Sequence, residues 1–365
     1  MWARILSLIV KELLALLRDP RGRMVLIAPP LIQLFIFTFA ATLEVRNVDI
    51  AIVNLDQGRW GRELVARIDA APTFDEVIVL RNVGEIRSVI DRRRVLAAIH
   101  IPQDFSRNIE AGRPAQAQIV LDGRRANAAQ ILFGYVNRIA AGMGAEARPQ
   151  PVLAEGIVRH WFNPNLVYRW FMVPALVAII TMLTAIVVTT LSVARERELG
   201  TFDQLLVSPL TRFEIMAGKV TPGFLIGAAQ GTLFIGLAVF VFGIPLTGSL
   251  PLLYLAMVFF LAAVLGVGLF ISSISATQQQ AIIGAFAFIA PAIMLSGFGA
   301  PIENMPDWLQ AFTTINPLRH FLVIVHGVFL KDMPMLEILR NTAPLVLIAG
   351  ATLPAAAWMF RVRTQ

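Results

Sequence analysis

The chain has 365 residues, 57% hydrophobic and 15% charged, and its mean hydropathy is +0.70. In soluble domains about a quarter of the residues are charged, so this composition argues against a soluble globular protein. The absence of cysteine excludes disulfides, thiolate metal sites and cysteine nucleophiles. The net charge of +7 would suit nucleic acid, but a membrane protein with positive cytoplasmic ends has the same excess, and we therefore expect no nucleic acid partner.

Residues 1–23 are predicted to form an amphipathic helix on the cytoplasmic surface of the lipid bilayer. Apolar residues recur there at helical spacing among five basic residues. A signal peptide needs an unbroken apolar run, and Lys11 and Glu12 interrupt this one. The helix is expected to end at Asp19-Pro20, since proline cannot continue it.

Six apolar segments are long enough to cross a bilayer, which takes about 20 residues each. The first contains Pro29 and Pro30, which predict a kink or a wide turn. No charged residue occurs from Val220 to Ile302, and two polar or Gly/Pro-rich breaks divide that stretch into three spans. The predicted spans are 24–43, 171–194, 220–242, 251–274, 279–299 and 341–360.

Six crossings return the C-terminus to the side of the N-terminus. The basic N-terminal segment, the loop 195–219 and the basic C-terminal end then share one side, which the positive-inside rule makes cytoplasmic. The fold class expected is an α-helical integral membrane protein with six transmembrane helices. Residues 171–365 would form a five-helix transmembrane region.

Residues 44–170 return to a soluble composition and are predicted to lie outside the cytoplasm. Strands are expected to begin at 48, 75, 95 and 116, and helices to cover about 59–71, 84–94 and 127–141. This alternation predicts an extracytoplasmic α/β domain between the first and second spans. The run Arg92, Arg93 and Arg94 is interpreted as a solvated helix end in preference to an anion site.

Residues 302–340 are amphipathic and separate the fifth and sixth spans. Their apolar run from His320 to Leu330 is too short to cross about 30 Å of hydrocarbon. We expect an outer interfacial or re-entrant helix, with Trp308 near the lipid headgroups.

The chain lacks the common signatures of catalysis and of ATP binding. Gly218-Lys219 is followed by Val220, and Phe213 stands where a phosphate-binding loop has its first glycine. The four histidines have no ligand partners at metal-binding spacing, so we expect no metal site. Because the chain has no ATPase motif of its own, we expect no enzymatic activity of the chain itself. No acidic residue lies within a span, which disfavours an ion-coupled secondary transporter.

The loop 195–219 is predicted to contain a short helix at about 201–208. Gly200 ends the preceding helix, and Ser208-Pro209 ends the short one. Two pairs have the spacing of a capping box, Thr201 with Gln204 and Thr211 with Glu214. The short helix is expected to present Phe202, Leu205, Leu206 and Leu210 among charged side chains. It would act as a rigid element that transmits a partner's motion, or as an ordinary connection between spans.

At this loop the sequence resembles the ABC-2 type permeases, the membrane subunits of bacterial ATP-binding cassette exporters, and most closely their drug-efflux branch. The family pattern runs E-x-G-T, a leucine pair, proline and E-x-x-x-G-K. The matching residues are Glu198, Gly200, Thr201, Leu205, Leu206, Pro209, Glu214, Gly218 and Lys219. Shorter matching segments start at Lys11, Val53, Ile99, Trp161 and Met305. His326-Gly327 departs from the Arg-Gly that many relatives have.

The resemblance implies a cytoplasmic ATPase subunit that holds ATP and magnesium, so no cofactor is expected on this chain. It implies that the helix after Thr201 is a coupling helix seated in a groove of that ATPase. The residues assigned to coupling are Glu198, Gly200, Thr201, Phe202, Gln204, Leu205, Leu206, Pro209, Glu214 and Lys219. It also implies a location in the bacterial inner membrane, a second permease copy or paralogue, and a periplasmic membrane fusion protein as a further candidate partner.

A run of small residues in the third span consists of Gly223, Gly227 and Gly231, which would let another helix approach closely. Packing within one chain is the favoured interpretation over a subunit interface. Because the spans hold no charge, we expect the permease to export an amphipathic or hydrophobic compound. Two alternatives remain, an ion-coupled secondary transporter and a membrane-anchored receptor or scaffold that uses residues 44–170.

Overall fold

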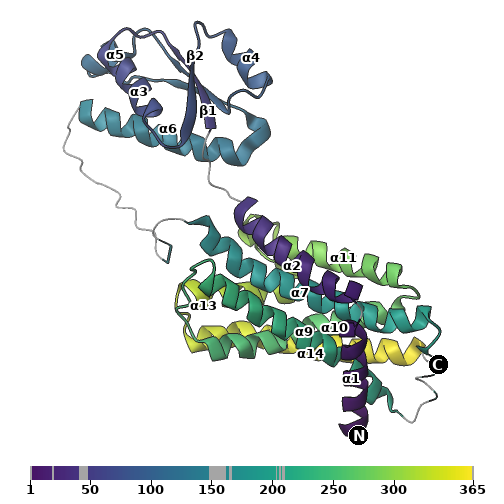
Figure 1. The fold of residues 1–365 in the computed structure, drawn as a ribbon. Helices are drawn as coiled ribbons and strands as arrows, with labels where there is room; N and C mark the ends of the chain where they lie inside the picture. The colour runs from purple at the N-terminus through teal and green to yellow at the C-terminus, as the bar shows by residue number, and fades with distance from the viewer. Residues whose placement is uncertain are drawn as a thin grey trace. The chain divides into compact units, whose positions relative to one another are not determined.

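The computed structural model describes residues 2–18, 20–40, 48–147, 162–163, 167–202, 204, 207 and 210–363. The chain divides into two compact units (Figure 1). One unit is a helical bundle made of residues 1–41 and 160–365, and the other is an α/β unit made of residues 42–159.

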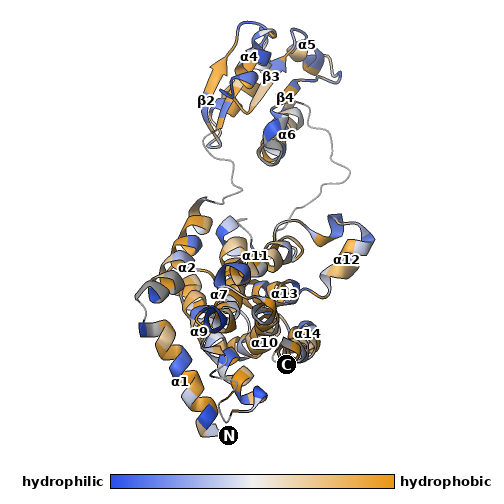
Figure 2. Cartoon of the chain, turned by 90° about the vertical axis from the view of Figure 1, so that its right-hand side faces the viewer, coloured by the Kyte–Doolittle hydropathy of each residue, from blue (hydrophilic) through white to orange (hydrophobic). Residues whose placement is uncertain are grey.

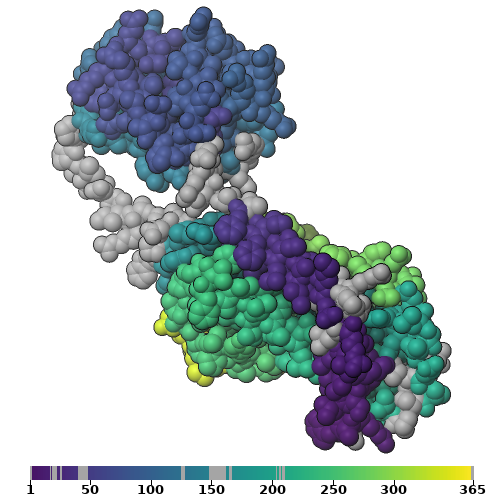
Figure 3. All heavy atoms as spheres, viewed as in Figure 1, coloured from purple at the N-terminus to yellow at the C-terminus, as the bar shows by residue number. Residues whose placement is uncertain are grey.

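The described part of the bundle consists of helices and their connections and contains no strand. Its elements are α1 (Trp2–Arg18), α2 (Pro20–Ala40), α7 (Tyr168–Glu198), α9 (Arg212–Phe240), α10 (Leu250–Ile274), α11 (Gln278–Met294), the 3-10 turn η2 (Ile302–Asn304), α12 (Asp307–Thr313), α13 (Pro317–Leu330) and α14 (Met335–Arg363). Figure 2 shows hydrophobic and hydrophilic residues side by side along α1, as expected of an amphipathic helix, and Figure 3 shows α1 on the outside of the bundle.

Four helices within the described ranges are long and apolar enough to cross a membrane, namely α7, α9, α10 and α14. Helices α7, α10 and α14 contain the predicted second, fourth and sixth spans, and α9 covers the predicted third span except its last two residues, because α9 ends at Phe240. The apolar parts of α2 (27–39) and of α11 (278–294) are shorter. The predicted fifth span ends too late, because α11 stops at Met294 and Gly297 takes a left-handed conformation with φ +88°.

The junction of α1 and α2 lies at Pro20, as predicted, and Pro20 is the first residue of α2. The prediction that Pro29 and Pro30 kink the first span or mark a wide turn is partly wrong. Helix α2 continues through both prolines and makes no turn there. Proline is tolerated within membrane helices when neighbouring groups satisfy the carbonyl that it leaves free.

One end of the bundle, which we call the loop end, collects the C-termini of α7, α10 and α14 and the N-termini of α9 and α11. The Ser272 hydroxyl of α10 accepts from the Ala194 N–H of α7, and the Gln278 N–H of α11 donates to Glu198. At the opposite end, Phe171 at the start of α7 stacks on Phe298, which follows α11. Successive long helices therefore run in alternating directions.

The helix α13 lies within the bundle core. Its Phe321 ring stacks on Phe260 of α10 at 4.2 Å, and His326 stacks on Phe171 of α7 at 4.9 Å. With 14 residues it is only about 21 Å long. Residues of α13 such as Phe321 and Val325 are buried in the bundle core, so within the described residues this apolar helix packs against protein. Trp308 in α12 is exposed.

The α/β unit begins with a strand and alternates strands with helices. Its elements are β1 (Val48–Asn54), α3 (Arg59–Asp69), β2 (Phe74–Val79), α4 (Glu85–Asp91), β3 (Ala97–Ile101), α5 (Phe105–Glu110), β4 (Gln118–Leu121), the 3-10 turn η1 (Gly123–Arg125) and α6 (Ala126–Ala147). All four predicted strands and three predicted helices are present. The short α5 was not predicted, and α6 extends beyond the predicted end at 141.

The four strands form one sheet in the order β2-β1-β3-β4. Strand β1 pairs in parallel with β2 and β3, and β4 pairs antiparallel to β3. Helices α3, α5 and α6 cover one face of the sheet with a core that includes Ile52, Ile99 and Leu132. Helix α4 covers the other face through Ile86 and Val89.

Two of the segments that carry the family resemblance meet in this unit. The Ser106 hydroxyl at the start of α5 donates to the Asp56 carboxylate, and it accepts from the Trp60 N–H at 2.9 Å. The Gly61 N–H also donates to Asp56 at 3.1 Å. Asp56 and Ser106 are buried. The segments from Val53 and Ile99 thus have a structural role, because together they fix the start of α3 against α5.

Candidate functional site

An ion cluster of two lysines and two glutamates joins three helices at the loop end. Lys219 of α9 places its Nζ 2.7 Å from Glu12 Oε1 of α1 and 2.6 Å from Glu196 Oε2 of α7. The Nζ of Lys11 lies 2.9 Å from Glu196 Oε1. The Lys219 side chain has no exposed surface, and both carboxylates are almost buried.

The formal charges of the ion cluster sum to zero. Taking each charge out of water is costly, and only close pairing of opposite charges offsets that cost in the interior. Ser192 adds two contacts, since its hydroxyl donates to Glu12 at 3.3 Å and its carbonyl accepts from Lys219 at 3.4 Å. Any movement that separates α1, α7 and α9 would leave a buried charge unpaired. The ion cluster therefore holds these three helices in one arrangement.

Gly218 allows α1 to lie against α9 next to the ion cluster. A methyl group added at Gly218 would lie 2.4 Å from a methyl carbon of Leu8 in α1, which is closer than packed atoms come. Leu8 is buried in this contact. Both residues of the Gly218-Lys219 pair thus serve one purpose, because the first gives α1 space and the second binds its carboxylate.

The end of α7 is a glycine cap of the predicted kind. Gly200 has φ +68°, its N–H donates to the Arg197 carbonyl, and the Thr201 N–H donates to the Glu196 carbonyl. This pair of hydrogen bonds is the Schellman motif. It turns the chain sharply away from α7 immediately beyond the ion cluster.

The predicted capping box of Thr211 and Glu214 is present at the start of α9. The Glu214 N–H donates to the Thr211 hydroxyl, and the Thr211 N–H donates to the Glu214 carboxylate at 2.8 Å. At the earlier predicted box, the Thr201 hydroxyl donates to the Glu196 carbonyl at 3.4 Å.

Phe202 is not exposed, contrary to expectation. Only 7% of its surface is accessible, and its ring meets Phe360 of α14 edge-on at 5.8 Å. The Arg197 guanidinium lies over the same ring at 5.0 Å and donates to the carbonyls of Ser273 and Ser275 at the end of α10. An aromatic ring gains more by leaving water for this apolar corner than by remaining on the loop surface. Phe202 thus anchors the loop to α14 and α10.

Other predicted coupling residues are distributed around this anchor. Glu198 accepts two hydrogen bonds from Gln278, which fastens α7 to α11. Gln204 is exposed, and Val207 has 87% of its surface accessible. Leu205, Leu206 and Pro209 lie outside the described residues. The loop therefore has a buried anchor followed by exposed side chains.

The three glycines of α9 face two helices of the same chain. Cβ atoms at Gly223, Gly227 and Gly231 would clash with α10, where Leu265, Leu261 and Met257 follow at the same four-residue spacing. The neighbouring side chains on α7 are Thr189, Ala185 and Thr181. This is the intrachain packing favoured from the sequence.

Sequence reasoning missed Glu12 and Glu196 as the partners of Lys219. A signal was available, because a lysine at the start of an apolar span needs a carboxylate nearby. The sequence offers several acidic residues in 1–23 and 195–219, and only the packing of α1 on α9 selects two of them.

Comparison with known proteins gives matches along nearly the whole chain. The model of a protein family described as "ABC-2 family transporter protein" matches residues 22–358 of the chain. The chain is 46% identical to the probable multidrug ABC transporter permease YbhR of Escherichia coli K12, with 99% of both chains covered. It is 32% identical to the probable multidrug ABC transporter permease YbhS of the same organism, over 96% of this chain and 94% of the relative. It is 30% identical to the inner membrane transport permease YhhJ, also of E. coli K12, over 98% and 96%.

Proposed function

The chain belongs to the ABC-2 family of transporter proteins and is the permease subunit of an ATP-binding cassette exporter, and on that premise we propose how it is driven and what it moves. ATP is hydrolysed, with magnesium, on a separate cytoplasmic subunit. The permease carries an amphipathic or hydrophobic compound out of the cytoplasm. The charge-free stretch from Val220 to Ile302 supports such a substrate, since it offers no charged partner to a small hydrophilic ion.

We further propose that α2, α7, α9, α10, α11 and α14 are six crossings, with the loop end in the cytoplasm. The alternating direction of the helices supports this topology, as does the contact of Phe35 and Phe39 in α2 with Phe242 beyond the end of α9. Both termini are then cytoplasmic, and residues 44–170 lie outside. The exporter contains two permeases, this chain and a second copy or paralogue.

The loop after Gly200 contacts the ATPase in this proposal. The observation that supports this contact is that the ion cluster lies next to the start of a loop whose described side chains Gln204 and Val207 are exposed. Because Lys219, Glu12 and Glu196 tie α9, α1 and α7 together, a force on the loop moves three helices jointly. The exposed Val207 offers the apolar surface expected of a contact with another subunit.

Replacement of Val207 by aspartate tests the contact. The side chain is exposed, so the fold should be unaffected, whereas a charge placed in a buried interface opposes association. We expect Val207→Asp to lower recovery of the ATPase with the affinity-tagged permease, and ATP-driven flux in proteoliposomes, by about tenfold or more. Val79→Asp is the matched control, because Val79 is 71% exposed in β2 of the other unit.

The same copurification distinguishes the alternatives. Undiminished ATPase recovery with Val207→Asp would contradict the contact. Transport by the purified chain under an ion gradient, with no ATPase present, would support a secondary transporter. Capture of an envelope protein without any ATPase would support a receptor or scaffold, and capture of both is the result expected if a periplasmic membrane fusion protein is an additional partner.

A further inference from the structure

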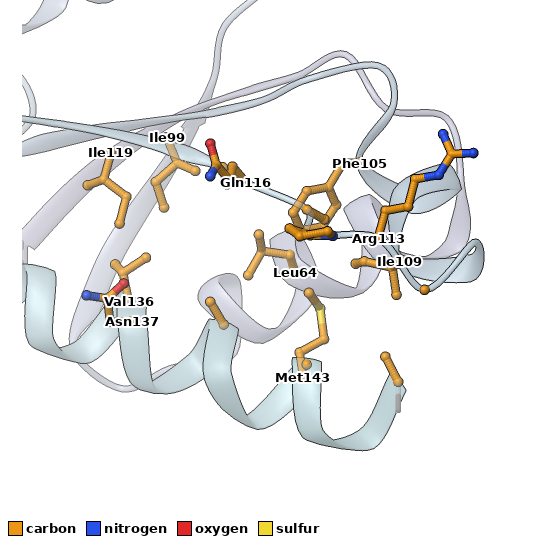
Figure 4. A pocket seen from close by; sticks show the side chains of 17 residues that line it. Leu64, Ile99, Phe105, Ile109, Arg113, Gln116, Ile119, Val136, Asn137 and Met143 are labelled. Atoms are coloured by element: carbon orange, nitrogen blue, oxygen red, sulfur yellow. The ribbon is translucent and has the colours of Figure 1, made fainter. Parts of the chain in front are cut away.

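The α/β unit contains a cleft of about 620 Å³ between the sheet, α6 and the loop that joins α5 to β4 (Figure 4). Clefts that hold small organic ligands have volumes of about 300–1,000 Å³. The cleft is formed wholly by this unit and shares no residue with the ion cluster.

The cleft exists because small residues line both of its sides. Ala115 and Ala117 lie on the loop side, and Ala140 and Gly144 lie on α6, where larger side chains would fill the space. The remaining lining is largely apolar. In Figure 4, Leu64 and Met143 point toward each other across the cleft, and Ile99 and Ile119 extend from the sheet above it.

The walls of the cleft are fixed by local hydrogen bonds. Gly112 has φ +71°, and the Arg113 N–H donates to the Asn108 carbonyl at 2.7 Å, so that a glycine cap holds the loop. The last turn of α6 is tied to α3, since the Arg67 guanidinium donates to both carboxylate oxygens of Glu146. Arg67 holds the pKa of the Glu146 carboxyl below its ordinary value. A site held in shape by such contacts loses little entropy on binding.

The polar groups of the lining indicate the charge of the ligand. None of the lining residues is acidic, and the single charged one is Arg113. Figure 4 shows its side chain at the edge of the cleft, extending outward, while Gln116 and Asn137 add hydrogen-bonding groups. We propose that the cleft binds an amphipathic anion of the fatty-acid kind. Its hydrocarbon part lies between the sheet and α6, and its carboxylate meets Arg113 at the rim.

The absence of native cysteine makes a direct test possible, because a single introduced cysteine is the only thiol. Ala140→Cys places it in the cleft, and Gln130→Cys places it on an exposed position of α6 as the matched control. The full chain is reconstituted in lipid nanodiscs, and the rate of maleimide modification is measured with decanoate, with decanol and without either. Ala117→Cys on the loop side gives a second reporter if the first disturbs the fold.

Decanoate at about ten times its dissociation constant should leave about a tenth of the sites unoccupied. The rate of maleimide modification of the Ala140→Cys variant should therefore fall about tenfold. Decanol should protect less, and Arg113→Gln in the same background should reduce protection by decanoate to the level of decanol. Equal modification rates with and without decanoate at both reporters would overturn the proposal. So would equal slowing at Gln130→Cys, which indicates an effect of the bilayer, or protection that is unchanged by Arg113→Gln.

Discussion

Lys219 is the residue on which the packing of the loop end most depends. Its ammonium group is fully buried between Glu12 and Glu196, so its removal leaves two nearly buried carboxylates with one exposed partner, Lys11. Breaking a buried ion pair by deleting one partner costs about 3–5 kcal/mol. We expect Lys219→Met to lower the free energy of unfolding by this amount, measured by denaturant unfolding of the detergent-solubilised chain.

Lys11→Met provides the control for that measurement. Lys11 belongs to the same ion cluster, but its side chain is 56% exposed, and such pairs contribute about 1 kcal/mol or less. The ion cluster would lose its assigned role if the two variants were destabilised equally.

The residues that carry the family pattern could be recognised from the sequence. Only some of their contacts could be predicted from it. The Gly200 cap and the Thr211 capping box depend on neighbours in sequence, and both are present as predicted. Phe202 was expected at the surface, because a sequence pattern does not reveal that Phe360, 158 residues later, lies beside it. Contacts between distant segments decide burial there.

Among the elements, α9 packs through its glycines more than through large apolar side chains. A leucine at position 227 would overlap Leu261 of α10, and overpacking of this kind typically costs about 1–3 kcal/mol. We therefore expect Gly227→Leu to lower the apparent melting temperature of the purified chain. Gly236→Leu on the same helix is the control, because a Cβ there meets nothing within 4 Å. Equal melting temperatures for the two variants would show that α9 can move away from α10.

Element boundaries followed from the sequence where a breaker residue sets them, and failed where packing does. Pro20 separates α1 from α2 as predicted, since proline is accepted at a helix start. The predicted end of the fifth span was too late, because apolar residues continue beyond Met294 after the backbone has turned. The location of α13 in the core could not be predicted from its apolar sequence, because an apolar helix suits a lipid interface as well as a protein interior.

In the whole molecule, each unit has hydrophobic clusters of its own. The clusters of the α/β unit draw on residues 48–143, and those of the bundle on α2 and on residues after 167. A fragment of residues 44–160 should therefore fold without the bundle. We expect it to be soluble, to show mixed helix and strand in circular dichroism, and to unfold cooperatively in urea. A fragment that unfolds without a cooperative transition would mean that the bundle stabilises this unit.

The continuity of α7 connects the two ends of the bundle. Phe171, which stacks on His326 of α13, and Glu196, which binds Lys219, belong to one unbroken helix and lie about 38 Å apart along its axis. A helix resists compression far more than it resists tilting. If Glu196 acts as a pivot, a tilt of about 5° would displace Phe171 by about 3 Å, roughly the thickness of an aromatic ring. The ring stack of Phe171 on His326 of α13 would then open or close in step with movement at the loop end.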